Sequence, residues 1–175
     1  MQNKRLVLGG GCFWCTEAVF LNVKGVSSVK SGYTGGHRPN PTYENICTGV
    51  SGHAEIIDIV YDEDKVSLAN LLEIFFVVHD PTTLNAQGAD KGTQYRSVIY
   101  YSSELEKEII QESIMRAQKD FSEKIVTEVS PLEEVYPAEE YHQNYYNQNS
   151  SQGYCQVIIA PKLKKFMVNF PERLG

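Results

Sequence analysis

The chain has 175 residues, 42% of them hydrophobic and 22% charged, which is typical of one ordinary soluble globular domain with a substantial core. The net charge of −6 gives no reason to expect nucleic acid or an anionic membrane as a partner. The sequence shows neither a transmembrane span nor a convincing signal peptide, and four cysteines are too few for a disulfide scaffold. We therefore expect a cytoplasmic, monomeric protein in a reducing environment.

Hydrophobic periodicity and turn residues predict alternating strands and helices along the chain. In chain order these are a strand at Leu6–Leu8, a helix from Cys12 to Leu21, strands at Val26–Tyr33 and Ala54–Tyr61, a helix at Leu68–Val78, a strand at Ser97–Tyr101, a helix from Ser103 to about Phe121, a short strand at Ile125–Val129 and a helix at Ala138–Tyr146. Ser67 is the expected N-cap of the second helix, and Ser103 with Glu106 forms a capping-box pattern at the start of the third. Two long loops, 35–47 and 81–94, separate them.

The order β-α-β-β-α-β as far as Tyr101 is that of a split βαβ, ferredoxin-like core. It predicts an α+β fold, a two-layer sandwich with helices on one face of the sheet. We expect a single catalytic domain over residues 1–175. Residues 1–147 would form its core, and residues 148–175 a mostly irregular tail that carries Cys155.

The first candidate functional residue is Cys12, which follows Gly9-Gly10-Gly11 at the expected start of a helix. A thiol there faces unpaired backbone N–H groups and the positive end of the helix dipole. Both effects lower a thiol pKa, so this position predicts a reactive thiolate.

Cys15 lies one helical turn beyond Cys12, on the same helix face, where the two thiols could form a disulfide. This spacing favours redox chemistry, as in a thioredoxin-like dithiol oxidoreductase, over a merely buried Cys15. A third possibility is a non-enzymatic zinc or peptide-binding module, but zinc would need two more ligands and no second C-x-x-C exists.

Other residues could surround a substrate of Cys12. Phe13 and Trp14 could be core residues or an apolar wall for a small group. Glu55 opens an apolar strand and could be a solvent-facing glutamate at the strand end, the more common case, or a buried acid whose raised pKa lets it donate a proton. Tyr43 and Tyr95 lie in the two long loops and could donate hydrogen bonds to a developing oxyanion.

Six motifs, in this order, resemble those of the A-type peptide methionine-S-sulfoxide reductases. They are Gly11-Cys12-Phe13-Trp14, Gly32-Tyr33-Thr34-Gly35-Gly36, Asn40-Pro41-Thr42-Tyr43-Glu44, Gly52-His53-Ala54-Glu55, His79-Asp80-Pro81-Thr82 and Gly92-Thr93-Gln94-Tyr95-Arg96-Ser97. The resemblance runs from about Leu6 to Gln143, and six ordered motifs are far more specific than any single short match.

This resemblance implies a role for each matched residue. Cys12 is the nucleophile that becomes a sulfenic acid, Glu55 the acid, and Tyr43 and Tyr95 the groups that bind the sulfoxide. Asp90 falls on the position of the family's supporting aspartate. Phe13 and Trp14 would hold the S-methyl group of the substrate, either protein-bound or free methionine-S-sulfoxide.

A second thiol must then condense with the sulfenic acid to form a disulfide. Many family members have glycine at the position of Cys15 and two cysteines in the tail, whereas this chain has only Cys155 there. Cys15 and Cys155 therefore both remain candidates for the resolving thiol, alone or in a relay. The resemblance implies thioredoxin as the external reductant and no bound cofactor or metal.

Overall fold

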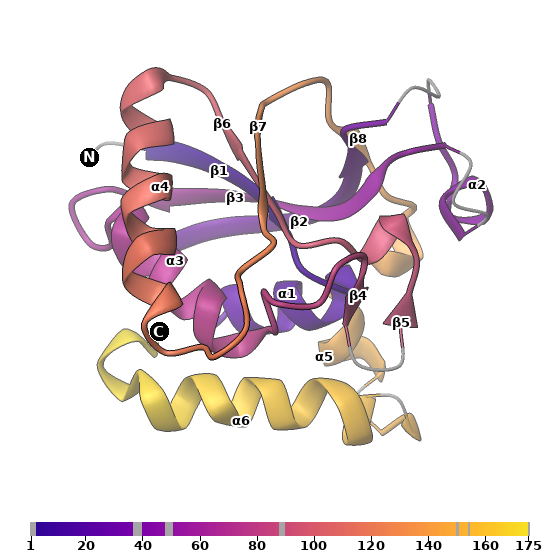
Figure 1. Ribbon diagram of the computed structural model, residues 1–175. Coiled ribbons are helices and arrows are strands. Elements are labelled where there is room, and N and C mark those ends of the chain that lie inside the picture. The colour runs from indigo at the N-terminus through magenta and orange to yellow at the C-terminus, as the bar shows by residue number, and fades with distance from the viewer. Residues whose placement is uncertain are drawn as a thin grey trace.

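The computed structural model describes residues 3–36, 40–47, 51–87, 90–149, 151–153 and 155–174 (Figure 1). Its strands are β1 (Asn3–Gly9), β2 (Val26–Thr34), β3 (Ala54–Asp62), β4 (Ala86–Gln87), β5 (Asp90–Lys91), β6 (Val98–Tyr101), β7 (Glu128–Pro131) and β8 (Tyr136–Pro137). Its α-helices are α1 (Phe13–Phe20), α2 (Tyr43–Cys47), α3 (Leu68–Val78), α4 (Glu104–Gln118), α5 (Tyr145–Asn149) and α6 (Ala160–Asn169). None of the helices in these ranges combines the length and apolar character that a membrane span requires.

The main sheet has the strand order β7-β6-β1-β3-β2-β8. Its four central strands pair with one another antiparallel, whereas β7 lies parallel to β6 at one edge. This is the arrangement that a split βαβ core produces, so the predicted α+β, ferredoxin-like fold is confirmed. The predicted caps of two helices are also present, because the hydroxyl of Ser67 accepts from the Asn70 N–H and that of Ser103 from the Glu106 N–H.

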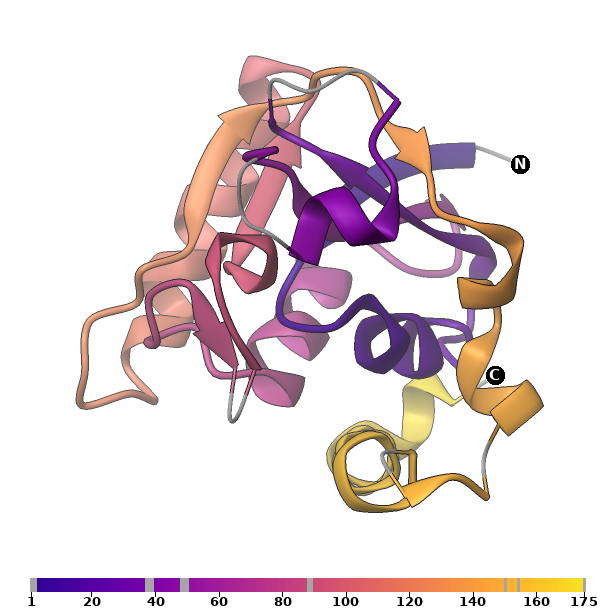
Figure 2. The same ribbon diagram turned by 90° about the vertical axis from the view of Figure 1, so that its right-hand side faces the viewer.

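Alternating side chains of the sheet enter two separate cores. Leu8 of β1, paired with Ile57 of β3, packs with α1 and α3 in the larger core. Val7 and Ile56 point to the opposite face and pack beneath Leu132, in the segment between β7 and β8. The helices thus cover one face of the sheet, and this extended segment crosses the other (Figure 2).

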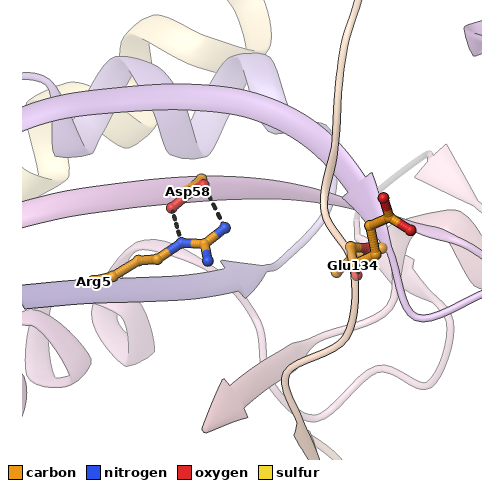
Figure 3. A network of polar contacts seen from close by, with 4 residues as sticks. Arg5, Asp58 and Glu134 are labelled. Carbon is orange, nitrogen blue, oxygen red and sulfur yellow. Dashed lines mark hydrogen bonds and ion pairs between the residues drawn. The ribbon is translucent and has the colours of Figure 1, made fainter. Parts of the chain in front are cut away.

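On the face away from the helices, Arg5 of β1 and Asp58 of β3 form a two-bond ion pair (Figure 3). Nε donates to Oδ1 at 2.9 Å and Nη2 to Oδ2 at 2.8 Å. The segment carrying Glu134 crosses the sheet in the same view. This ion pair lies at the solvent-exposed margin of the core on this face of the sheet.

The prediction of a mostly irregular tail is wrong. A π-helical turn, Cys155–Ile159, runs into α6, which packs against α1 and α3 on the side away from the sheet (Figure 1). Ile159, Leu163, Phe166 and Phe170 form the buried face, with the i, i+4, i+7 spacing of an amphipathic helix. Cys155 therefore belongs to the core.

Boundaries elsewhere also differ from the predictions, and two differences bear on the site and its surroundings. The strand expected at Ile125–Val129 begins three residues later, as β7. The helix expected at Ala138–Tyr146 is instead a 3-10 turn, Glu140–His142, followed by α5. Asn144 lies between them with a φ of 55°, a left-handed conformation that ends the first turn.

If α6 is an integral part of the fold, Phe166→Ala should destabilise the protein by about 3–5 kcal/mol, because it removes a fully buried aromatic ring. Val168→Ala on the exposed side of the same helix should cost less than about 0.5 kcal/mol. Urea unfolding of the two variants measures both values. Equal, small effects would mean that α6 does not pack on the core.

Candidate active site

A glycine turn places Cys12 at the start of α1. Gly11 has a φ of 88°, and a Cβ there would lie 2.8 Å from the Cγ of Gln87, so both conformation and space require glycine. The Gly11 N–H donates to the carbonyl of Tyr95 at 3.1 Å, which joins this turn to the loop after β5. Cys12 is then the N-cap residue of α1, as predicted.

The predicted low pKa of Cys12 is wrong. Its side chain is only 6% exposed, and burial is the largest of the effects that raise the thiol pKa well above its ordinary value. The hydrogen bond with Cys15 and the charge of Glu55 raise it further, against the backbone N–H of Trp14, which lowers it. A position at a helix start lowers the pKa of a thiol that is in contact with solvent, and Cys12 is not.

Glu55 is a buried carboxyl directly beside this helix start, only 1% exposed. Its Oε1 accepts from the Phe13 N–H at 3.1 Å, whereas Oε2 is buried without a hydrogen-bond partner among the described residues. Burial raises the pKa of Glu55 to about 8, the Phe13 N–H lowers it, and the charge of Asp90 adds to the increase. The predicted increase is confirmed, and a carboxyl with this pKa is mostly protonated at pH 7.

Phe13 and Trp14 lie in an aromatic cluster around the same point. The Phe13 ring is fully buried and stacks on Tyr43 with ring centres 6.5 Å apart. Trp14 is partly buried, stacks on Tyr145 at 3.8 Å and donates its indole N–H to Nδ1 of His142 at 3.0 Å. The cluster therefore surrounds the first turn of α1 with aromatic rings, an environment that suits a small apolar group.

The other predicted site residues lie nearby, in the two long connections of the chain. Tyr43 opens α2, and its backbone N–H donates to Oε2 of Glu139 at 3.0 Å. Tyr95 ends a short 3-10 helix, Thr93–Tyr95, and its carbonyl holds Gly11. Asp90 begins β5 close enough to Glu55 for its charge to affect the Glu55 pKa.

Three residues that support this site were not predicted from the sequence. Glu139 accepts from the Tyr33 hydroxyl at 2.9 Å as well as from Tyr43. His142 and Tyr145 hold the two sides of the Trp14 ring. All three come from a stretch about 130 residues from Cys12, and the only signal there was an unusual density of aromatic and polar side chains.

The three cysteines whose side chains the structure describes share the larger core. Cys15 is 2% exposed and Cys155 fully buried. The Cys15 side chain is hydrogen-bonded to Cys12, and its charge contributes, after burial, to a raised pKa of Cys155. Cys15 is therefore in contact with Cys12, and near enough to Cys155 for its charge to affect that thiol.

A buried thiol, a carboxyl that is protonated near neutral pH and further thiols within reach define a thiol-dependent oxidoreductase. The carboxyl suits a substrate whose oxygen must be protonated as the sulfur reacts.

Comparison with known proteins identifies the family. The model for "Peptide methionine sulfoxide reductase" matches residues 4–174. Relatives named peptide methionine sulfoxide reductase MsrA from Saccharolobus solfataricus and Polynucleobacter asymbioticus are each 54% identical over 95% of this chain, covering 94% and 89% of their own lengths. The chain belongs to the A-type peptide methionine sulfoxide reductase family, enzymes that use thiols to reduce methionine sulfoxide.

Comparison with solved structures leads to the same family. The reduced form of Mxr1 from Saccharomyces cerevisiae has a TM-score of 0.82 and 33% identity, covering 88% of this chain and 90% of that one. Methionine sulfoxide reductase A of Corynebacterium diphtheriae has a TM-score of 0.78 and 36% identity, with coverages of 89% and 78%. Mxr1 in complex with Trx2, at a TM-score of 0.58 and 23% identity, shows the fold alone. These findings favour the sulfoxide reductase over the thioredoxin-like and zinc-module alternatives.

The pKa of Glu55 gives a direct test of the site. Its infrared carboxylic-acid band should be present at pH 7 and disappear as the pH rises through about 8, because the folded protein holds it protonated below that value. Difference spectra against Glu55→Gln isolate the band. Disappearance of the band between pH 4 and 5 would show an ordinary, solvated carboxyl instead.

Proposed function

We propose that this chain reduces methionine-S-sulfoxide, in proteins or as the free amino acid, through a sulfenic acid on Cys12. The observation that carries the proposal is the bond from the Phe13 N–H to Glu55, which holds a neutral, buried carboxyl next to the Cys12 thiol. The preference for the S epimer follows from the family resemblance.

The first step converts one thiol and one sulfoxide into a sulfenic acid and methionine. The sulfur of Cys12 attacks the sulfoxide sulfur while Glu55, through its unpartnered Oε2, protonates the sulfoxide oxygen. The oxygen moves to Cys12 as the S–O bond of the substrate breaks, and the thiol proton of Cys12 restores Glu55. No electron donor other than Cys12 is consumed in this step.

The remaining site residues position the substrate in this proposal. The phenols of Tyr43 and Tyr95 donate hydrogen bonds to the sulfoxide oxygen as its charge develops. Asp90 supports Glu55 in its neutral form, consistent with the effect of its charge on the Glu55 pKa. Phe13 and Trp14 enclose the methyl group, supported by the aromatic cluster that contains both.

A thiol relay then regenerates Cys12. Cys15 condenses with the sulfenic acid, releasing water and forming the Cys12–Cys15 disulfide. Cys155 attacks Cys15, which frees Cys12 and leaves a Cys15–Cys155 disulfide. The hydrogen bond of Cys15 with Cys12, and the effect of the Cys15 charge on the pKa of Cys155, support this order. A dithiol reductant restores both thiols, and the Mxr1–Trx2 structure supports a thioredoxin in that role.

Cys12→Ser should abolish methionine formation, because serine cannot accept the oxygen from the substrate. In the unmodified protein, with one equivalent of methionine sulfoxide and no reductant, two thiols should be lost for each methionine formed. Thiol titration and chromatographic assay of methionine measure both. Full turnover by Cys12→Ser would rule out the proposed mechanism.

The relay order predicts different trapped species in two further variants. Cys155→Ser should stop at a Cys12–Cys15 disulfide, and Cys15→Ser should accumulate a Cys12 sulfenic acid that dimedone labels. Peptide mass spectrometry after a single turnover identifies each species. Formation of a Cys12–Cys155 disulfide in Cys15→Ser, as fast as disulfide formation in the unmodified protein, would show that Cys15 is not an obligatory intermediate.

A further inference from the structure

Glu17 is a second buried carboxyl near the site, and the proposed chemistry does not use it. It lies on α1, three residues after Trp14, and is only 1% exposed. A carboxyl this buried is costly unless donors surround it, so its partners indicate what it does.

Its partners come mainly from one distant segment. Oε1 accepts from the backbone N–H of Tyr145 at 3.2 Å, and the backbone N–H of Asn144 also donates to the carboxyl. Oε2 accepts from the hydroxyl of Ser31 at 3.4 Å. Two consecutive backbone N–H groups thus point into the core at Glu17, which the left-handed conformation of Asn144 makes possible.

The same segment holds the indole ring of Trp14. His142, at one end, accepts the indole N–H at 3.0 Å, and Tyr145, at the other, stacks on the ring with planes only 7° apart. Glu17 and Trp14 are three residues apart on one helix and therefore on one face. The carboxyl fixes the segment to the very helix that carries the ring.

A second link keeps the segment on the sheet without reaching α1. The Gln143 side chain accepts from the Ser31 N–H at 2.9 Å and donates to the Ser31 carbonyl at 3.0 Å. Among the described contacts, Glu17 is the group that ties the backbone of Asn144 and Tyr145 to α1.

From these contacts we propose that Glu17 is a positioning residue for the reductase reaction. It anchors the His142–Tyr145 segment on α1, and this segment fixes the Trp14 ring in the position where it encloses the substrate methyl group. The substrate-binding consequence rests on the proposed function of Trp14, whereas the anchoring of the ring does not.

The protein contains a single tryptophan, so its fluorescence reports Trp14 alone. Glu17→Ala should shift the emission to longer wavelength and raise acrylamide quenching, because Tyr145 is no longer held against the ring. It should also raise the KM for a methionine sulfoxide peptide by roughly tenfold, with kcat changed less than about twofold, since a methyl seat binds ground state and transition state alike.

Glu17→Gln should restore both properties. Its amide oxygen can accept the two backbone N–H groups, and its amide nitrogen can donate to the Ser31 hydroxyl. If Glu17→Ala does not fold, Glu17→Asp provides the same test, because the shorter side chain keeps the charge but withdraws the acceptor from the segment. The aspartate variant should then show the altered fluorescence and KM.

Asp62→Ala is the matched control, since Asp62 is another buried carboxyl that accepts a backbone N–H, from Asp64, but lies at the far end of β3. It should lower stability and leave the Trp14 fluorescence and the KM unchanged. Unchanged fluorescence in folded Glu17→Ala, or an equal change in Asp62→Ala, would overturn the anchoring. Turnover by Cys12→Ser would instead refute the proposed function, while the fluorescence result would stand.

Discussion

The hydrogen bond from the Phe13 N–H to Glu55 is the contact on which the rest of the site depends. It joins the first turn of α1 to the start of β3, so the thiol and the acid are placed by two core elements rather than by loops. A free N–H at a helix start needs an acceptor, and a buried carboxyl needs a donor. One bond satisfies both, and leaves the second carboxyl oxygen available for a substrate.

Around this bond, the site is assembled from segments distant in the chain. The glycine turn is fixed by the loop that carries Tyr95, and the aromatic cluster is completed by the stretch from Glu139 to Tyr145. The ferredoxin-like sheet makes this possible. Its central strands β1 and β3 are antiparallel, so the end of β1, before Cys12, lies beside the start of β3, which carries Glu55. Cys12 and Glu55 are thus held at the ends of core strands, and the groups that support them come from the surrounding loops and tail.

The sequence predicted the central fold well, because strand alternation and the Ser67 and Ser103 caps are local signals. Glu55 was indicated by the Gly52-His53-Ala54-Glu55 motif of the family rather than by the strand itself, because a glutamate at a strand end commonly faces solvent. The sequence missed the supports at Glu139, His142 and Tyr145, whose meaning depends on partners about 130 residues away. In α6, the lysines between Leu163 and Phe166 obscure the apolar pattern of the buried face, so the helix was not predicted. The pKa of Cys12 depends on its burial, which no local sequence pattern reveals.

The burial of Cys12 has a consequence for the protein between turnovers. An accessible thiolate would react with peroxides and alkylating agents, which in an oxidatively stressed cell are the very conditions that generate its substrate. A thiol kept protonated and covered is a poor target for both. In the proposed mechanism, the sulfur of Cys12 therefore stays unreactive until a sulfoxide enters the site, and the oxidants that generate the substrate do not inactivate the protein.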